Sequence, residues 1–485
     1  MKNVWIAAPA LSLAVWAGPA LAQDHQHEHT PPTQQEPAPE HQHGAAAQPS
    51  AQPHEHHPGM QHGGRLTDQT GDQEPDEDAL LDNVGHPNTM YGHGDPDIMG
   101  HMRGLYGPYA IGRDASGTAW QPDVSSHGGV HASHGDWMLM SHALLNGVYA
   151  WSDGPRGDEK AFLSGMVMGA ARREIGERGT LNLRAMLSPD PFMGADGYPL
   201  LFAAGESADG VEPLVDRQHP HDLFMELSAS YAHRIGERSS VFVYGGLPGE
   251  PAFGPPAFMH RMSAMDSPEA PITHHWFDST HITFGVVTAG VTHGDWKLEA
   301  SQFRGREPDE DRYDLEGGDL DSSAVRLSWN PSENLSLQGS WADIESPEAL
   351  EPDEDEERWS ASGIYTRPIG DGWWSATLAF ANKERSDGVS LDAWLAEAAW
   401  HPNDRWTVFA RGEAIETDEL GAVHHGPVEN VARVSAGAVR DWRINEHAVF
   451  GIGALVQQHF ASSALEPLYD GDPVGTMAFA RLKIG

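Results

Sequence analysis

The stretch from Met259 to His281, "MHRMSAMDSPEAPITHHWFDSTH", gathers side chains that bind transition metals. It holds four His and three Met in 23 residues, in a chain of 485 residues that has no Cys. Neutral imidazole binds copper, zinc and nickel, and thioether sulfur prefers soft ions such as Cu(I). The candidate metal ligands of this stretch are Met259, His260, Met262, Met265, His274, His275 and His281, the last expected to open a strand.

A second pair of imidazoles stands at the end of the preceding long link, in "DRQHPHD", as His219 and His221. The next long link, 247–279, begins "LPGEPAFGPPAF" and carries little charge, so we expect it to fold inward and narrow the lumen of a barrel. The two sets of imidazoles would then meet at one rim, with Asp222 and Asp278 as carboxylates that orient the rings. The alternative is a packed loop whose imidazoles only hydrogen-bond to backbone and carboxylate.

A third set of candidate ligands follows strand periodicity. Met138, Met140 and His142 alternate, so they project to one face of a strand, and Met166 and Met168 do the same on the next. Met186 shares the polar parity of a third strand. These six side chains are expected to face the lumen and to suit Cu(I) or Ag(I). Met is also a common packing residue, which is the competing interpretation.

The fourth set lies in residues 23–65, a low-complexity segment rich in His, Pro, Gln and Ala. Such composition cannot form a packed core, so we expect disorder, and neighbouring imidazoles can share one ion without a fold. A soluble spacer of biased composition is the alternative. The candidate ligands here are His25, His27, His29, His41, His43, His54, His56, His57 and His62, beside Met60.

The start of the chain predicts export. Lys2, an apolar run to Ala17 and the small residues Ala20 and Ala22 resemble a cleaved signal peptide over residues 1–22. The formal net charge is −41, from 71 acidic and 30 basic residues. This balance excludes nucleic acid as a partner and favours cations. The acidic links "GREPDEDRYDLEGGDLD" and "SPEALEPDEDEER" are expected to concentrate cations electrostatically, without forming dedicated calcium sites.

From Trp137 onward, segments of about ten residues alternate in polarity between turns, which is the pattern of a transmembrane β-barrel. In "NLSLQGSWAD", Leu335, Leu337 and Trp341 share one face and Ser336 and Ser340 the other. Tight turns such as "IGERG" and "THGD" alternate with long links. We expect strands at 137–149, 160–173, 180–188, 222–233, 239–246, 280–290, 294–303, 322–330, 334–343, 358–367, 372–383, 390–400, 405–415, 430–440, 446–459 and 475–484.

The sequence therefore predicts an all-β protein, a transmembrane antiparallel barrel of about sixteen strands (range 12–18) over residues 137–485. The disordered His-rich segment, and an irregular Gly/His/Met-rich linker or plug over 66–136, would precede it. The expected location is the outer membrane of a Gram-negative bacterium, with the N-terminal segment in the periplasm. A soluble all-β protein, such as a propeller, is the alternative fold.

The signal peptide, His-rich leader and C-terminal barrel resemble, in layout, the copper-resistance B proteins of Gram-negative bacteria. The Met-rich repeats of that family's leader are missing here, because His dominates and Met60 stands almost alone. The resemblance implies copper binding and copper tolerance. It carries over no individual residue.

The leading functional hypothesis is that the barrel binds a transition metal and helps to handle or export it. Copper is favoured, and zinc and nickel remain open. The expected partners are outer-membrane lipid, metal ions and periplasmic metal-handling proteins. A general or solute-specific porin is the alternative, with Arg172, Arg184, Arg326 and Arg411 lining the lumen beside Glu226. An outer-membrane hydrolase built on Ser279 and His281 is the third, and no G-x-S-x-G turn supports it, so no enzyme is expected.

Overall fold

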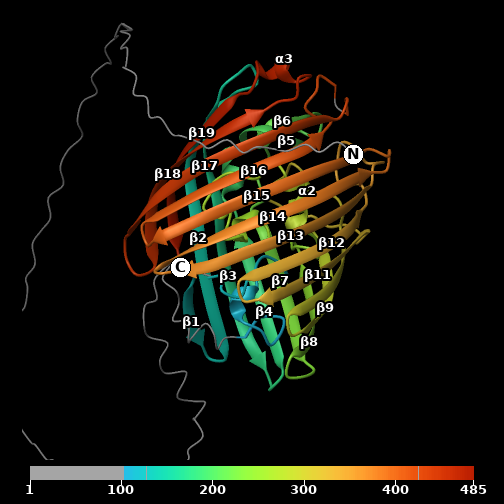
Figure 1. The fold of residues 1–485 in the computed structure, drawn as a ribbon. Coiled ribbons are helices and arrows are strands. Elements are labelled where there is room, and N and C mark those ends of the chain that lie inside the picture. Colours follow the sequence, from blue (N-terminus) through green and yellow to red (C-terminus); the bar gives the residue numbers. More distant parts are fainter. Residues whose placement is uncertain (1–102, 127, 424) are drawn as a thin grey trace, which may run out of the picture. The chain divides into compact units, whose positions relative to one another are not determined.

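The computed structural model describes residues 103–126, 128–423 and 425–485. Their dominant element is a closed sheet of sixteen antiparallel strands (Figure 1). The expected signal peptide, the His-rich segment and the first part of the linker lie outside these residues. The barrel strands are β2 (Trp137–Ser152), β3 (Glu159–Ile175), β4 (Gly179–Leu187), β7 (Phe224–Arg234), β8 (Ser239–Gly246), β9 (Val286–His293), β10 (Trp296–Phe303), β11 (Ser322–Ser332), β12 (Leu335–Ile344), β13 (Glu356–Ile369), β14 (Gly372–Arg385), β15 (Ser390–Asn403), β16 (Trp406–Thr417), β17 (Glu429–Arg443), β18 (Ala448–Phe460) and β19 (Val474–Ile484).

Smaller elements lie between and before these strands. Strand β1 (Val130–His134) forms a hairpin with β2, and β5 and β6 pair with each other. Their bounds, with those of the helices, are β5 (Tyr198–Ser207), β6 (Pro213–Gln218), η2 (Ile111–Arg113), η3 (Asp190–Met193), η4 (Phe258–His260), α2 (His274–Phe277), η5 (Ser279–His281) and α3 (Glu466–Tyr469). Among the described residues, no helix is long and apolar enough to span a membrane.

The barrel closes where β19 pairs with β2, from Gly475 opposite Ser152 to Ile484 opposite Ala143. Strand β2 continues beyond this ladder, and its first residues pair with β1, with Ser141 opposite Val130. Strand β1 therefore covers the part of β2 that β19 does not reach. Closure leaves no unpaired edge along the sheet, which a membrane-spanning sheet requires.

Alternating side chains give the barrel an apolar exterior and a polar interior. On β3, Leu163 and Val167 point outward and are 52% and 45% exposed, whereas Ser164 between them is buried. On β16, Val408 is exposed while Arg411 is buried on the opposite face. An apolar outer band around a polar interior is the arrangement of outer-membrane barrels, and it reverses that of soluble proteins.

The predicted fold class and strand number are confirmed. Most expected strand bounds differ from the observed ones by up to three residues, and the largest error is at 280–290, where the strand begins at Val286 and His281 belongs to η5. Strand β1 also lies in the part of 66–136 that was expected to be irregular. The hairpin of β5 and β6 also falls in a link for which no strand was expected. Its run Tyr198–Ala203 is buried on both faces, so it lacks the alternation that marks the barrel strands.

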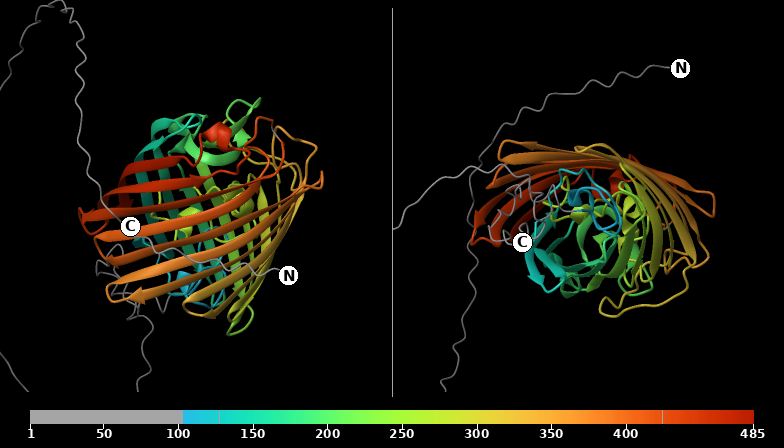
Figure 2. Two further views of the ribbon diagram at one scale, coloured as in Figure 1. Left: turned by 45° about the horizontal axis from the view of Figure 1, so that its top comes forward. Right: turned by 90° about the horizontal axis from the view of Figure 1, so that it is seen from below.

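Three segments fold into the lumen, and Figure 2 shows the first of them, in blue, within the ring of strands. Residues 103–125 lie at the short-turn end, where the Val124 amide donates to the carbonyl of Glu333. Arg184 donates to the Gly117 carbonyl at 2.6 Å, and Arg326 to the Thr118 hydroxyl at 3.1 Å. Cationic side chains of the barrel wall thus hold this segment.

The second inward segment is the hairpin of β5 and β6, which packs with lumen-facing side chains of the barrel wall. The third is the link between β8 and β9, whose expected inward fold is confirmed. Arg261 in this link is fully buried and pairs with Glu397 of β15 at 2.8 Å and with Asp278 at 3.0 Å. Further along, Glu269 pairs with Arg433 of β17 at 3.3 Å. Buried ion pairs such as these fix a segment in place, because losing one partner leaves a desolvated charge.

Candidate metal centre

Five imidazoles converge where the second and third inward segments meet. We call His219, His221, His274, His275 and His281 the imidazole pentad; none is more than 8% exposed. The ring centroids of His221 and His281 lie 5.1 Å apart, and those of His274 and His281 lie 5.2 Å apart. His275 lies 5.6 Å from both His219 and His274. The structure thus brings together the two His sets that the sequence places more than fifty residues apart.

Within the pentad, His221, His274 and His281 form an imidazole triad in which Nδ1 is engaged in the same way. Each ring has its Nδ1 next to an oxygen: Asp190 Oδ2 for His221 and Asp278 Oδ1 for His274, both at 2.9 Å, and the Asp278 carbonyl for His281 at 2.6 Å. An Nδ1–H that donates to oxygen leaves Nε2 with a free lone pair, the tautomer that binds metals.

The Nε2 atoms of His221 and His281 are buried and have no hydrogen-bond partner among the described residues. A buried polar atom without a partner costs about 1–3 kcal/mol. A metal ion that accepted these lone pairs would remove that cost. Binding of a metal ion to these two nitrogen atoms would therefore be energetically favourable.

The separations between the triad's ring centroids are close to those of a metal centre, but one of the three is too long. A tetrahedral ion bound by imidazole nitrogens at about 2.0–2.1 Å places ring centroids roughly 5 Å apart. Two of the three triad separations match, whereas His221 and His274 are 6.5 Å apart. Among the described residues, no three ligand atoms of the pentad lie within 4.8 Å of one another. Metal binding therefore requires a small inward movement of these rings.

Burial favours the neutral form of three imidazoles of the pentad. Burial lowers the pKa values of His219, His275 and His281 well below the usual range. Glu206 lies 3.0 Å from His219 Nε2 and also pairs with Arg312. Burial raises the pKa of nearby Asp222 to about 7, and Arg312 opposes this rise. Burial thus keeps His219, His275 and His281 in the neutral form that coordinates metals.

Short irregular elements place these rings. Helix α2 carries His274 and His275, and η5 carries His281. Two glycines allow the close approach of backbone to site. A Cβ on Gly205 of β5, whose φ is +109°, would meet the His275 ring at 2.8 Å, and one on Gly254, at φ +71°, would meet the Phe277 carbonyl at 2.0 Å. Only glycine fits both positions without strain.

Beside the pentad lies a group of thioethers that we call the methionine cluster. Met166, Met168, Met186 and Met225 are buried together, and Met140 and Met259 pack against them. Strands β2, β3 and β4 supply Met140, Met166, Met168 and Met186. The alternation of these strands in the sequence predicts that the four side chains face the lumen. The structure therefore groups five of the Met residues singled out from the sequence and adds Met225.

Several sequence-predicted ligands lie elsewhere. Met138 has the expected parity, but it stands near the beginning of β2 and is 36% exposed, outside the methionine cluster. His260 lies near His142, with ring centroids 6.4 Å apart, rather than in the pentad. Met262 is buried in the larger core cluster, and Met265 packs against it. The His residues of the segment 23–65 lie outside the described residues.

Sequence reasoning missed the side chains that orient the pentad. Asp190 and Glu206 come from the link between β4 and β7, and Glu307 and Arg312 come from the link between β10 and β11. Glu307 lies 3.7 Å from His275 Nδ1, and burial raises the pKa of Glu307 to about 8. Asp222, expected to orient an imidazole, instead pairs with Arg312 at 3.4 Å. The acidic link "GREPDEDRYD" was expected only to concentrate cations, whereas the structure buries its Glu307 and Arg312 beside the pentad.

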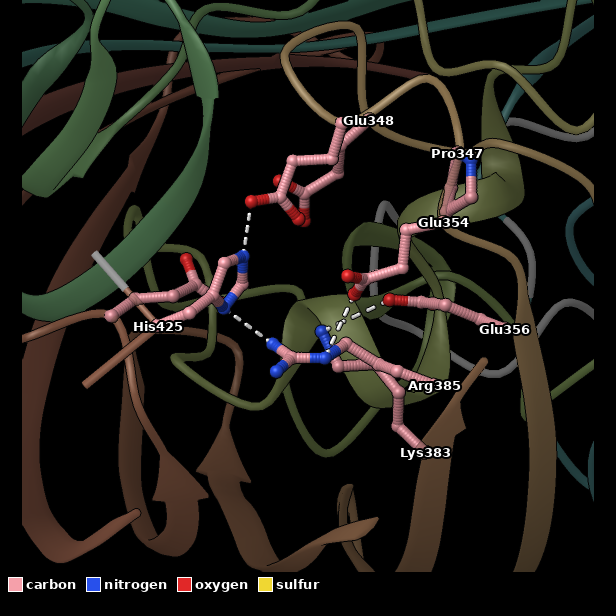
Figure 3. A pocket seen from close by; sticks show the side chains of 9 residues that line it. Pro347, Glu348, Glu354, Glu356, Lys383, Arg385 and His425 are labelled. Atoms are coloured by element: carbon pink, nitrogen blue, oxygen red, sulfur yellow. Dashed lines mark hydrogen bonds and ion pairs between the residues drawn. The ribbon is translucent and has the colours of Figure 1, made fainter. Parts of the chain in front are cut away.

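A separate set of ligand atoms lies at the rim, where Glu351, Glu354 and His425 come within 4.8 Å of one another. Figure 3 shows Arg385 between His425 and Glu354. The guanidinium lies 2.6 Å from His425 Nδ1 and 2.8 Å from Glu354 Oε1. A fixed cation in the middle of the donor set opposes metal binding there. The exposed set Asp309, Asp314 and Glu316 is a surface acidic group.

The side chains considered for a hydrolase are engaged separately. Ser279 Oγ accepts a hydrogen bond from Arg358 at 2.8 Å, and His281 Nδ1 lies 2.6 Å from the Asp278 carbonyl. A nucleophile and its base need a direct hydrogen bond. These two contacts direct Ser279 and His281 to different partners.

No protein-family model matches the chain, and no characterised protein matches it by sequence. Among solved structures, an anion-selective porin from Comamonas acidovorans is 9% identical at a TM-score of 0.44, covering 72% of this chain and 100% of that chain. OmpF of Salmonella typhi, in complex with daunomycin, is 9% identical at a TM-score of 0.44, covering 73% and 100%. OmpT of Vibrio cholerae, an outer-membrane protein, is 8% identical at 0.42, covering 73% and 100%. The sixteen closed strands and the apolar exterior identify a porin-like outer-membrane barrel.

Proposed function

We propose that this protein is an outer-membrane barrel that binds a divalent transition metal ion at the imidazole pentad in its lumen. The observation that carries the proposal is the triad: three buried rings, each with Nδ1 held by oxygen, two of which have unpartnered Nε2 atoms. Neutral imidazoles with anchored Nδ1 atoms are a preorganised set of metal donors.

The chemistry of the donors selects the class of ion. Nitrogen donors without thiolate suit Cu(II), Zn(II) and Ni(II), and the general affinity order among these places copper highest. The nearby carboxylates Asp190, Glu206 and Asp278 offset the positive charge of an ion, and Arg261 and Arg312 offset part of their negative charge. The comparisons offer no support for copper in particular. A role in moving the ion across the membrane, with the His-rich segment as a capture site, is part of this proposal.

The test uses the full chain purified in detergent and loaded with Zn(II), so that the His-rich segment contributes equally to every sample. We expect the variant His221→Gln/His274→Gln/His281→Gln to retain one zinc ion fewer per chain than the unmodified protein after dialysis, as counted by elemental analysis. His459→Gln is the matched control, because His459 is also buried but lies in β18 with Nδ1 on the Pro473 carbonyl. An unchanged zinc count in a triad variant that still folds would refute the proposal.

A porin is the second candidate, favoured by the sixteen-strand closure and the charged lumen. The arginines expected to line that lumen are ion-paired: Arg184 with Glu226 at 2.8 Å, and Arg411 with Glu397 at 3.2 Å. Polar pairs facing a barrel interior set charge preference in porins. Planar-bilayer recording separates the two candidates, because a porin shows steady conductance that added Zn(II) leaves unchanged.

A further inference from the structure

The methionine cluster contains a row of soft donors across adjacent strands. In the sheet register, His142 of β2 lies opposite Met168 of β3, and Met168 lies opposite Met186 of β4. Side chains directly opposite one another have Cβ atoms about 4.5–5.5 Å apart. One imidazole and two thioethers therefore stand side by side on the lumen face.

The inward link completes this donor set. Met259 packs against the buried cluster that contains Met168 and Met186, and the ring of His260 lies 6.4 Å from that of His142. The cluster as a whole holds six of the sixteen Met residues of the chain. Leu or Val would serve packing alone, and the polar lumen of a barrel does not call for an apolar group of this size. The concentration of Met residues beside two imidazoles therefore points to a bound metal ion.

The charge of the donors limits which ion they accept. All the thioethers are neutral. Glu226, which faces Met186 across β4 and β7, is already paired with Arg184 at 2.8 Å. Desolvation disfavours a buried divalent ion without compensating carboxylates far more than a monovalent one. Thioether and imidazole are also the donors that Cu(I) and other soft ions prefer.

This group lies directly beside the pentad. Phe258 contacts the rings of His221, His274 and His281, and the next residue, Met259, belongs to the methionine cluster. Ile282, which follows His281, packs in the same cluster. Helix η4 therefore lies between the two donor sets: its Phe258 contacts the pentad, and its Met259 packs in the methionine cluster.

We propose that the methionine cluster, with His142 and His260, is a binding site for a soft monovalent metal ion, Cu(I) or Ag(I), distinct from the divalent site of the pentad. The donors are Met168, Met186 and Met259 with the two imidazoles, and Met140, Met166 and Met225 form the apolar surround. This site stands on its own residues, so it holds whether or not the pentad binds Zn(II).

The test is X-ray absorption of the full chain loaded with one equivalent of Cu(I) under anaerobic conditions. Because the chain has no Cys, any sulfur shell around copper must come from Met. We expect a sulfur shell in the unmodified protein that is lost in Met168→Leu/Met186→Leu, a change that keeps side-chain volume. Met477→Leu, a buried Met of β19 in the other core cluster, is the matched control and should keep the shell.

Two further samples keep the proposals separable. The triad variant should retain the copper–sulfur shell, and Met168→Leu/Met186→Leu should retain the zinc count. A sulfur shell that persists in Met168→Leu/Met186→Leu, or that is missing in the unmodified protein, would overturn the soft-metal site. If that variant fails to insert, Ag(I) titration of the single variant Met186→Leu replaces it, and silver affinity equal to that of the unmodified protein would overturn the proposal as well.

Discussion

The pentad and the methionine cluster occupy neighbouring parts of one lumen but are built in opposite ways. The pentad is carried by links, and its triad rings are fixed by carboxylate or carbonyl oxygens, as His221 is by Asp190 at 2.9 Å. The methionine cluster is carried mainly by strands, and the barrel register alone places Met168 and Met186 opposite each other. A site of nitrogen donors oriented by oxygen atoms and a site of soft thioethers can thus be separated by mutation.

The strongest test of this difference is removal of the ion pairs that hold the inward link. Arg261→Met would leave Asp278 without its arginine and Glu397 with Arg411 alone, and breaking a buried ion pair costs about 3–5 kcal/mol. We expect lower stability to urea in lipid vesicles, followed by tryptophan fluorescence, and loss of zinc retention. Copper–sulfur scattering should survive in part, because β3 and β4 keep Met168 and Met186 in place.

The control for Arg261→Met is Arg405→Met, at an exposed turn where Arg405 lies 3.8 Å from Asp404. An exposed pair of this kind contributes at most about 1 kcal/mol. Equal stability losses in the two variants would show that the buried pairs do not anchor the link.

A smaller effect is expected from the oxygen that orients a single ring. Asp190→Asn keeps a hydrogen-bond acceptor for His221 but removes its negative charge. Loss of such an orienting carboxylate typically lowers metal affinity by about 10–100-fold. Zinc titration by calorimetry should show this decrease with unchanged stoichiometry, while silver affinity stays constant. A parallel fall in silver affinity would mean that the two sites are one.

We expect a weaker effect on stability and zinc affinity from a change in the backbone beside the pentad. Gly205→Ala places a Cβ 2.8 Å from the His275 ring in a backbone conformation with φ +109°. We expect a stability loss of about 1–3 kcal/mol and a smaller change in zinc affinity than for Asp190→Asn, because His275 lies outside the triad. Gly412→Ala in β16, where a Cβ meets nothing within 4 Å, should change neither quantity in thermal unfolding and zinc titration.

The smallest effect concerns delivery of cations. Asp309, Asp311 and Asp314 lie on the exposed link that also contributes Arg312 to the site. Replacing the three with Asn should slow zinc uptake at low ionic strength and leave the final zinc count unchanged, because surface charge steers ions over about one Debye length. Stopped-flow uptake at 1 M salt should be the same in both proteins. A difference that persists at 1 M salt would assign these residues a direct role.

The sequence predicts the side chains on barrel strands better than those on the links between strands. Alternation placed Met166, Met168 and Met186 inside, because a strand has a fixed period of two. The hairpin of β5 and β6 escaped prediction because its run Tyr198–Ala203 is buried on both faces. The pairing of Asp190 with His221 escaped as well, because irregular links have no periodicity from which a contact can be derived.

Anomalous diffraction at the zinc edge, on crystals of the full chain soaked in Zn(II), tests the central claim most directly. We predict a peak about 2.0–2.1 Å from the Nε2 atoms of His221, His274 and His281, with His221 and His274 drawn closer than their present 6.5 Å. Zinc density confined to Glu351, Glu354 and His425, or to the surface carboxylates, with the triad rings unmoved, would contradict a metal centre in the lumen.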